Sequence, residues 1–452
     1  MNLSTVLSKI RPDARECKKM DSFIKRLIKT SEKLSSEARP IICGSAEKDT
    51  WLSKKNEVDL FLLFDSSLSK VELEKRGMGL AKSIVKKLRG KYQIAFAEHP
   101  YIKSRIGCYD VDIVPCYDIE NPERIKSSVD RTPHHVKFVK SKLKNPDEVR
   151  LLKQFCIANG CYGADVKTLG FSGYLCELLI IKYGSFEKLA KTASKWRAGH
   201  IITFNNSTEE QARLFKTPLV VIDPVDRNRN VAAAVSMEKF YTFVDACKKF
   251  NKKPSKELFL PSKPKPYTIT KLTKIIKRRG TRWYHISFAK PKVVNDILYP
   301  QMKRCTKAVG NMLTRNGFRV LRSDFFCNDG CHIVLEMEEW EIPRIYKNIG
   351  PDVYSRHVEE FIKHYQDKKV FIENDNWLVE LEREFVRVSD YLKNLFSLSE
   401  RELKEKGIPS KISPKIRKAN LFYDNGFLMK AKKSKDLRIF LKEWLEKDLD
   451  VV

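Results

Sequence analysis

The chain has 452 residues, 42% of them hydrophobic. A chain of this length is too long to fold around a single hydrophobic core and predicts about two to four domains. Its 87 Lys and Arg against 57 Asp and Glu give a formal net charge of +30, which favours a polyanionic partner, with RNA or DNA as first candidate. No apolar run approaches the roughly 20 residues that span a bilayer. The first residues also lack an apolar signal core, so we expect no membrane partner. The 11 cysteines, an odd number, fit free thiols in a reducing cytoplasm.

The first part of the chain predicts a helix followed by a strand and a tight turn. Residues 1–37 are expected to be helical, because apolar side chains recur at helical spacing between Lys18 and Leu34. Arg39-Pro40 ends this helix and begins a strand that leads to Gly44-Ser45. A turn without a bulky side chain can bring backbone N–H groups close to phosphate oxygens.

The next strand, from Glu57 to Phe64, carries two carboxylates on one face. Because side chains alternate along a strand, Glu57 and Asp59 lie about 7 Å apart on one side, and apolar residues occupy the other. Two neighbouring carboxylates repel each other unless a cation lies between them, and oxygen ligands at this spacing suit Mg²⁺. A solvated strand face would show the same residue types. The order of strand, Gly-Ser and acidic-x-acidic inside an apolar run favours a nucleoside triphosphate site.

A third carboxylate is expected on a neighbouring strand. This motif order resembles the signature of the nucleotidyltransferase superfamily that includes DNA polymerase beta. A helix is predicted from Leu73 to Leu88, then strands over 92–98 and 102–107, and then Tyr109–Tyr117, where Asp110 and Asp112 share one face. We choose Asp112, because the sequence Asp-Ile-Val-Pro-Cys-Tyr that it opens resembles the third-carboxylate strand of the archaeal, class I CCA-adding enzymes.

The resemblance to class I CCA-adding enzymes continues along about the first 250 residues and is weaker in the tail. It is carried by Ser-Val-Asp-Arg-Thr-Pro (128–133), Glu-Val-Arg-Leu-Leu-Lys (148–153), Gly-Phe-Ser-Gly-Tyr-Leu-Cys-Glu-Leu-Leu (170–179), Asp-Pro-Val-Asp (223–226) and Arg-Asn-Val-Ala-Ala (229–233). It implies template-independent addition of C, C and A to the 3′ end of tRNA from CTP and ATP, with two Mg²⁺ ions and release of pyrophosphate.

The same resemblance assigns the site residues. The expected catalytic residues and metal ligands are Glu57, Asp59 and Asp112. The expected contacts to ATP or CTP are Gly44, Ser45, Lys48, Thr132, His135, Lys153, Tyr162 and Arg229. His135 is preferred to its neighbour His134 from its distance after Thr132-Pro133. Arg229 is expected to discriminate between bases, because a guanidinium offers forked donors to the acceptor edge of C.

The loop after Gly44 departs from the family pattern in its middle. Family members usually carry a basic residue, often arginine, where this chain has Lys48, which loses a bidentate fork. Glu47 and Asp49 add negative charge beside the expected phosphate contacts. These carboxylates either weaken nucleotide binding or point away from the site.

The remaining segments predict a fold of the α+β multidomain class. We expect a catalytic palm domain with a mixed β-sheet over 1–145, a central helical domain over 146–258, and a basic α/β tail over 259–452. Helices of the central domain are predicted after Asn145-Pro146 and at Gly173–Tyr183, Phe186–Lys195 and Met237–Phe250, with Ser172 as a cap.

The tail is expected to bind RNA. Prolines between Pro254 and Pro266 mark a linker, and residues 263–292 contain no acidic side chain. Basic residues interrupted by Trp283 and Tyr284 suit a phosphate backbone and exposed base faces, although a solvated charged face is the alternative. A helix over 292–316, broken near Pro300, and strands at 284–288 and 331–337 complete the predicted tail. The resemblance implies docking of the acceptor and TΨC arms of tRNA and hints at a homodimer.

Two further functions remain open from the sequence. One is a related polymerase that adds A residues to RNA or makes oligoadenylate, which nucleotide choice would distinguish from CCA addition. The other is a non-catalytic RNA-binding protein on a worn nucleotidyltransferase fold, against which the presence of all three carboxylates argues.

Overall fold

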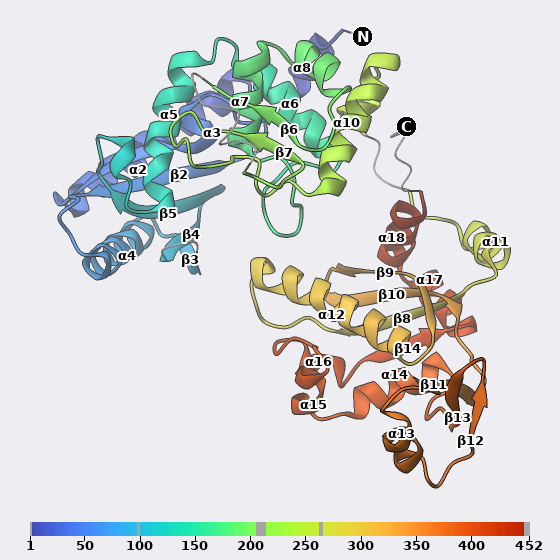
Figure 1. The fold of residues 1–452 in the computed structure, drawn as a ribbon. Helices are drawn as coiled ribbons and strands as arrows, with labels where there is room; N and C mark the ends of the chain where they lie inside the picture. Colours follow the sequence, from blue (N-terminus) through green and yellow to red (C-terminus); the bar gives the residue numbers. More distant parts are fainter. Residues whose placement is uncertain (1, 97–99, 205–213, 262–264, 447–452) are drawn as a thin grey trace. The chain divides into compact units, whose positions relative to one another are not determined.

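The computed structural model describes residues 2–96, 100–204, 214–261 and 265–446 (Figure 1). Contacts within the chain divide it into two compact units, with residues up to Ser262 in the first and Lys263–Asp448 in the second. The first unit contains both the predicted palm and the predicted helical domain. The finer boundary at 145/146 stays a prediction.

The first unit is built on a five-stranded mixed sheet, as expected. Its order is β1-β2-β5-β4-β3, in which β2 and β5 pair in parallel and the other neighbours are antiparallel. The strands are β1 (Ala38–Cys43), β2 (Glu57–Phe64), β3 (Lys91–Phe96), β4 (Pro100–Ile106) and β5 (Tyr109–Tyr117). The predicted strand over 92–98 ends outside the described residues at 97 and 98.

Both faces of the two central strands are covered by helices. On one face, α2 (Ala14–Leu34) and α4 (Lys70–Lys87) pack on the apolar side chains of β2 and β5. On the other face, Val136 of α5 (Arg131–Lys142) packs on Phe61 of β2 and Cys116 of β5. The carboxylates are at the starts of β2 and β5, outside the apolar contact with α5. Each of the two strands therefore has an acidic start and a buried end.

Pro115 lies within the central strand β5, where a missing N–H would ordinarily break a ladder. The strand β4 pairs with β5 only as far as the Ile102–Ile113 position, whereas β2 pairs with it along its full length. At Pro115, β5 therefore has a partner strand on the β2 side only and is an edge strand on the β4 side. The ring instead contacts α4, where a Cβ on Gly77 would lie 2.4 Å from the Pro115 Cβ.

A helical layer completes the first unit. Its core gathers apolar residues from α6, α7, α8 and α10, and α1 packs on it as well. Ser172 caps α7 as predicted, because its side chain accepts from the Leu175 N–H at 3.1 Å. The elements are α1 (Ser4–Ile10), α3 (Gly44–Glu47), α6 (Pro146–Ala158), α7 (Gly173–Tyr183), α8 (Phe186–Ala193), β6 (His200–Ile202), β7 (Leu219–Val221), α10 (Met237–Lys252) and the 3₁₀ turns Pro122–Arg124, Ser128–Asp130 and Lys256–Leu258.

The second unit contains a four-stranded sheet of order β14-β8-β10-β9 and a three-stranded sheet of order β11-β13-β12. Its strands are β8 (Arg282–Ala289), β9 (Arg319–Cys327), β10 (Gly330–Glu339), β11 (Ile345–Asp352), β12 (Val370–Glu373), β13 (Asn376–Glu382) and β14 (Asn420–Tyr423). Its helices are α11 (Ile269–Arg279), α12 (Asn295–Arg315), α13 (Val358–His364), α14 (Val388–Ser397), α15 (Glu400–Glu405), α16 (Ser413–Ile416), α17 (Asn425–Lys433) and α18 (Lys435–Leu445). The predicted strands at 284–288 and 331–337 are present within β8 and β10.

Two expectations for the tail are wrong. The helix α12 continues through Pro300, and Leu298 before it and Met302 after it are both fully buried. Trp283 and Tyr284 are 2% and 1% exposed, so neither presents a free face for a base. Both faces of β8 are buried, whereas many of the basic residues of this segment lie on α11 before it.

A helix that spans a membrane must be both long and apolar. None of the helices in the described ranges is long and apolar enough to cross a bilayer.

We expect opposite effects from alanine at two glycines of α4. Gly77→Ala should lower the free energy of unfolding by about 1–3 kcal/mol, because the new Cβ collides with the rigid Pro115 ring. Gly79→Ala should raise it by about 0.5–1 kcal/mol, because that site is open and alanine favours the helix. Urea unfolding of the two variants measures both, and equal effects would contradict the packing of α4 on β5.

Candidate active site

Gly44 allows the turn after β1 to lie directly against the first carboxylates. Cys43 is the backbone partner of Asp59 in the sheet. Gly44 has φ +67°, and a Cβ there would lie 1.7 Å from Asp59 Oδ2. The carbonyl of Ser45 accepts from the Thr50 N–H at 3.0 Å and closes the loop that follows. Only glycine satisfies both the backbone angle and the close approach.

The three predicted carboxylates lie on one face of adjacent strands. In the parallel pairing of β2 with β5, Asp59 is opposite Asp112 and Glu57 is opposite Asp110. The carboxylate of Asp110 is engaged by Arg105, with 2.7 Å between NH1 and Oδ2. Asp110 lines the same cleft as the other three carboxylates, but its charge is already balanced by Arg105, which favours Asp112 as the third carboxylate.

Two of the carboxyl groups, Asp59 and Asp112, have raised pKa values. Burial raises the pKa of Asp59, and Glu57 adds to this effect although Lys48 opposes it. Burial also raises the pKa of Asp112, to about 6; Lys103 opposes this shift, and Asp59 and Glu57 add to it. The carboxylates of Glu57, Asp59 and Asp112 therefore repel one another when they are ionised, and a bound cation would relieve this repulsion.

A cleft of ≈ 630 Å³ opens beside these carboxylates, lined by residues of β2, β3, β4 and β5. Its carboxylate oxygens are the donors that Mg²⁺ prefers. Within the described ranges, no three acidic, His or Cys side chains are grouped closely enough to hold a metal ion as they stand. The donor set and the mutual repulsion of the carboxylates fit Mg²⁺, and binding would require the three side chains to turn towards one another.

Two of the predicted phosphate-binding cations meet a buried glutamate. Glu177 of α7 accepts from Lys48 Nζ at 2.5 Å and from Thr50 Oγ1 at 2.6 Å. Lys153 Nζ donates to Thr50 Oγ1 at 2.9 Å and lies 3.5 Å from Glu177 Oε1. Burial would raise the pKa of Glu177, but Lys48 and Lys153 outweigh it and lower the pKa. The carboxylate is therefore charged and fixes both ammonium groups.

Tyr162 lies beside the same cations. A Cβ on Gly173, the first residue of α7, would be 3.2 Å from the Tyr162 hydroxyl and 3.6 Å from Lys153 Nζ. The absence of a side chain at Gly173 therefore lets Tyr162 and Lys153 share the N-terminal turn of α7. Burial raises the pKa of Tyr162, so its hydroxyl remains a donor.

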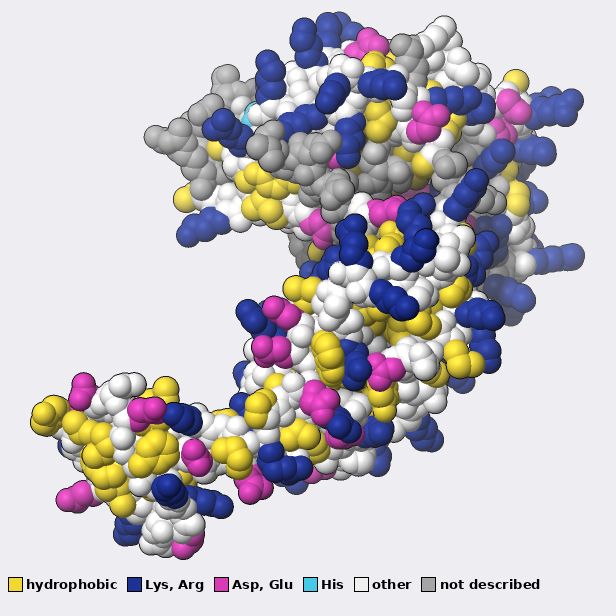
Figure 2. Space-filling model, turned by 90° about the vertical axis from the view of Figure 1, so that its right-hand side faces the viewer, with side chains coloured by type: hydrophobic (Ala, Val, Ile, Leu, Met, Phe, Trp, Pro, Cys, Tyr) yellow, Lys and Arg dark blue, Asp and Glu magenta, His cyan; other side chains and the backbone are white. Residues whose placement is uncertain are grey.

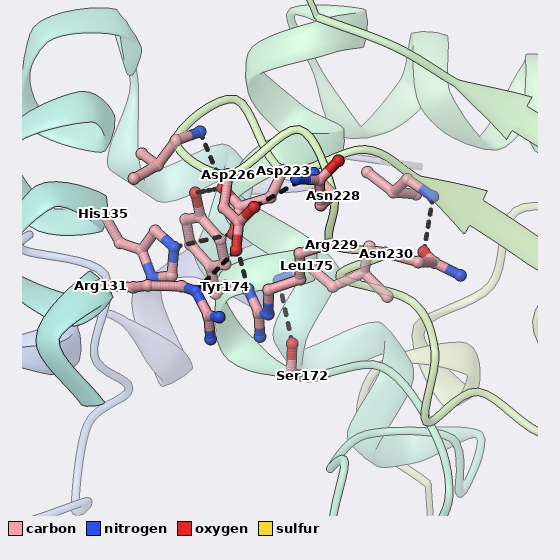
Figure 3. Close-up of polar contacts among 12 residues, drawn as sticks. Arg131, His135, Ser172, Tyr174, Leu175, Asp223, Asp226, Asn228, Arg229 and Asn230 are labelled. Atoms are coloured by element: carbon pink, nitrogen blue, oxygen red, sulfur yellow. Dashed lines mark hydrogen bonds and ion pairs between the residues drawn. The ribbon is translucent and has the colours of Figure 1, made fainter. Parts of the chain in front are cut away.

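His135 and Arg229 are joined by a second buried carboxylate, Asp223 (Figure 3). Asp223 Oδ2 lies 2.9 Å from His135 Nε2 and accepts from Arg229 NH1 at 2.7 Å, and Oδ1 accepts from the Tyr174 hydroxyl at 3.1 Å. The Tyr174 ring stacks on His135 with 4.0 Å between ring centres, and Lys48 Nζ lies 5.7 Å from the Tyr174 ring centre. Tyr174 thus connects the His135 group with the Lys48 group.

Thr132 lies in the first turn of α5, next to Arg131, whose Nε donates to Asp226 Oδ2 at 2.8 Å. The contact ties the start of α5 to the same 223–230 loop that carries Arg229. Ser45 and Thr132 both lie in the first turn of a helix, α3 and α5 respectively.

Comparison with known protein families places three models along the chain. The nucleotidyltransferase domain matches residues 24–135, the second domain of tRNA nucleotidyltransferase matches 147–260, and the C-terminal domain of the CCA-adding enzyme matches 279–419. The three matches follow one another with short gaps.

Curated relatives extend over most of the chain. A CCA-adding enzyme of Methanoregula boonei is 38% identical over 86% of this chain and 85% of its own length. Those of Archaeoglobus fulgidus and Methanosarcina mazei are 38% and 36% identical, over 83% and 97% of this chain and 84% and 97% of theirs. The chain belongs to the CCA-adding enzyme family.

Solved structures also resemble part of the chain. A solved structure of the Cid1 poly(U) polymerase covers 57% of this chain and 96% of that chain at 15% identity, with a TM-score of 0.46. A likeness at this level carries no argument about function.

Glu47 and Asp49, in the loop after Gly44, depart from the usual pattern of the CCA-adding enzyme family, and each forms an ion pair here. Lys140 of α5 donates to Glu47 at 2.5 Å, and Arg150 of α6 contacts Asp49. Arg150 is 3% exposed and also donates to the Trp51 carbonyl at 3.0 Å. Of the two outcomes open from the sequence, these ion pairs support the one in which the acidic side chains turn away from the nucleotide.

Sequence reasoning missed two residues of this CCA-adding enzyme family site, Glu177 and Asp223. Both stood inside motifs that resemble the family, and neither was given a role. The available signal for Glu177 was an acidic residue in the middle of an otherwise apolar helix, which must be paired when it is buried. The signal for Asp223 was its position directly after the apolar run of β7.

Gly44→Ala should abolish most nucleotide incorporation while the protein stays folded. The new Cβ must displace Asp59 or the turn by more than 1 Å, and a displacement of this size costs about a hundredfold in rate. Gly107→Ala is the matched control, because Gly107 also has positive φ, +61°, but has nothing within 4 Å of the added Cβ. Incorporation assays compare the two, and equal loss would contradict the contact with Asp59.

Asp112→Asn should stabilise the metal-free protein at neutral pH. The folded-state pKa of Asp112, about 6, exceeds the ordinary value of 3.8, so its charge destabilises the fold increasingly as the pH rises from 4 to 6. The variant should therefore gain about 1–3 kcal/mol above pH 6, and the gain should vanish below pH 4. Thermal melts in EDTA measure it.

Asp110→Asn serves as the control for this melt, because Asp110 pairs with Arg105 and should gain nothing. A lower melting temperature for Asp112→Asn than for the unaltered protein at pH 7.5 would contradict the raised pKa of Asp112.

Proposed function

We propose that this protein adds C, C and A to the 3′ end of tRNA, using CTP and ATP and releasing pyrophosphate. The observation that carries the proposal is the opposition of Asp59 and Asp112 on paired strands beside Gly44. It occurs in a chain whose relatives, named CCA-adding enzymes, match most of its length. CCA addition is therefore favoured over the addition of A residues alone and over RNA binding without catalysis.

Glu57, Asp59 and Asp112 would hold two Mg²⁺ ions. Bound there, the metal would supply Lewis-acid activation of the RNA 3′-hydroxyl and charge neutralisation at the triphosphate. The protein contributes three carboxylates from two adjacent strands, fixed by their pairing and by the helices behind them. Loss of any one should remove most activity, and near-normal turnover of Asp112→Asn would exclude its role.

The triphosphate would be bound by Ser45, Lys48, His135, Lys153 and Tyr162, with Gly44 and Thr132 beside them. Lys48 and Lys153 are already fixed by Glu177, so little side-chain entropy remains to be lost when phosphate oxygens arrive. An ammonium carries three donors, and Glu177 accepts from one of those of Lys48.

Arg229 would select the base without a nucleic-acid template. Its side chain is 36% exposed, while NH1 is held by the fully buried Asp223. A guanidinium oriented at one end presents its remaining N–H groups in a fixed direction, as recognition of an acceptor edge requires.

The tRNA would be bound by its shape and phosphate backbone, with the second unit docking the acceptor and TΨC arms. Lys and Arg side chains recur across the face drawn in Figure 2, with fewer Asp and Glu between them, in keeping with a net charge of +30. Because Trp283 and Tyr284 are buried, base stacking on these two residues is not part of the proposal.

Two further parts of the proposal come from the family resemblance and the substrate. We expect a homodimer. We also place the activity in the cytoplasm, where tRNA is found and where the 11 cysteines would stay reduced.

A tRNA transcript that lacks its terminal CCA tests this function. With purified protein and Mg²⁺, CTP alone should add two C residues, and a final A should follow only when ATP is also present. Asp59→Ala should abolish both steps because it removes a ligand common to both metals. Product lengths on a sequencing gel measure each addition.

Other outcomes identify other functions. Tails of A without any C would support a related poly(A)-adding enzyme. Tight tRNA binding without any addition would support a non-catalytic RNA-binding protein.

A further inference from the structure

Asp223 is a fully buried carboxylate that no part of the reaction described above uses directly. It follows β7 in the first unit and has 0% side-chain exposure. Side chains from three segments converge on it, namely His135 of α5, Tyr174 of α7 and Arg229 of its own loop (Figure 3). The Val225 N–H adds a backbone donor at 3.0 Å.

Asp223 is ionised in this setting. Burial alone would raise its pKa, but the hydrogen bonds from His135, Val225 and Arg229 outweigh it and lower the pKa to about 2. An ionised carboxylate only accepts, so His135 donates from Nε2. Burial lowers the pKa of His135 itself, which leaves Arg229 as the permanent positive charge on Asp223.

The two residues that Asp223 joins have different expected tasks. His135 is a phosphate contact, and Arg229 is the base-selecting residue. Both bind the same oxygen, Oδ2, at 2.9 Å and 2.7 Å. A shift of either side chain therefore moves or weakens the hydrogen bond of the other.

The loop that carries Arg229 has its own anchors, separate from Asp223. The Asn230 side chain accepts from the N–H groups of Val221 and Ala232 at 2.9 Å and donates to the Leu219 carbonyl at 3.1 Å. These contacts fix the backbone at the C-terminal end of the loop. The loop therefore retains its position without the Asp223 carboxylate, whose distinctive contribution is the direction of two functional side chains.

We propose that Asp223 is a positioning residue that couples triphosphate binding by His135 to base selection by Arg229, so that its loss relaxes the choice between CTP and ATP. This inference rests on the proposed CCA addition. It differs from a purely structural role, which would change stability or kcat but would leave the ratio between the two nucleotides unaltered.

Asp223→Asn tests the coupling, because it keeps the shape and removes the charge. On tRNA lacking CCA, kcat and KM are measured for CTP and ATP at the first added position. We expect KM for both nucleotides to rise about tenfold and the ratio of kcat/KM for CTP over ATP to fall about tenfold. Asp226→Asn is the matched control, because Asp226 is in the same loop and pairs with Arg131 instead.

A double-mutant cycle with Arg229→Gln separates coupling from general damage. If Asp223 acts on selection through Arg229, the double variant should lose no more discrimination than Arg229→Gln alone. Additive losses, or an unchanged CTP to ATP ratio in Asp223→Asn, would overturn the inference while CCA addition by the unaltered protein still stands. Failure of the unaltered protein to add C would reject the proposed function and this inference together.

Tyr174→Phe is a second test of the inference, for use if Asp223→Asn does not fold. It removes one donor to Asp223 but keeps the ring that stacks on His135. The CTP to ATP ratio should fall about threefold. An unchanged ratio in a folded Tyr174→Phe protein would also overturn the inference.

Discussion

The parallel pairing of β2 with β5 is the constraint on which the rest of the site depends. It places Asp59 opposite Asp112 and, two residues earlier, Glu57 opposite Asp110. The helices on both faces bury the later residues of the two strands, so only their starts remain open to a ligand. A one-residue shift in register would exchange the acidic and apolar faces, and burial on both sides prevents it.

Charge is distributed unevenly across the site. Glu177 and Asp223 are buried carboxylates with cations in direct contact, and these pairs are complete before any substrate arrives. At Asp59 and Asp112 the nearby cations do not outweigh burial, and the pKa of each carboxyl is raised. Under the proposed function, the cations held by Glu177 and Asp223 would serve the nucleotide, and the carboxylates of β2 and β5 would be balanced by a metal ion.

Sequence reasoning reached most of the fold but only part of the site. The mixed sheet, the cap at Ser172 and the helices after Asn145 follow from local patterns of alternation, helical period and capping. The burial of Trp283 could not be predicted from the sequence, because the strand β8 directly follows the basic helix α11 and the two together have the composition of an exposed nucleic-acid surface. The apolar helix around Glu177 indicated that this residue must be paired, but its partner Lys48 could not be predicted, because it lies 129 positions earlier and no local pattern joins the two.

The ion pairs of the loop after Gly44 bear on how the site empties. Glu47 and Asp49 keep Lys140 and Arg150 occupied on the protein, so these two cations are not available to phosphate oxygens. After each proposed addition, pyrophosphate must depart before the next nucleotide can enter, and every uncommitted cation would slow its departure. A loop with its own acidic residues is therefore suited to rapid product release between successive additions, at the expense of tight substrate capture.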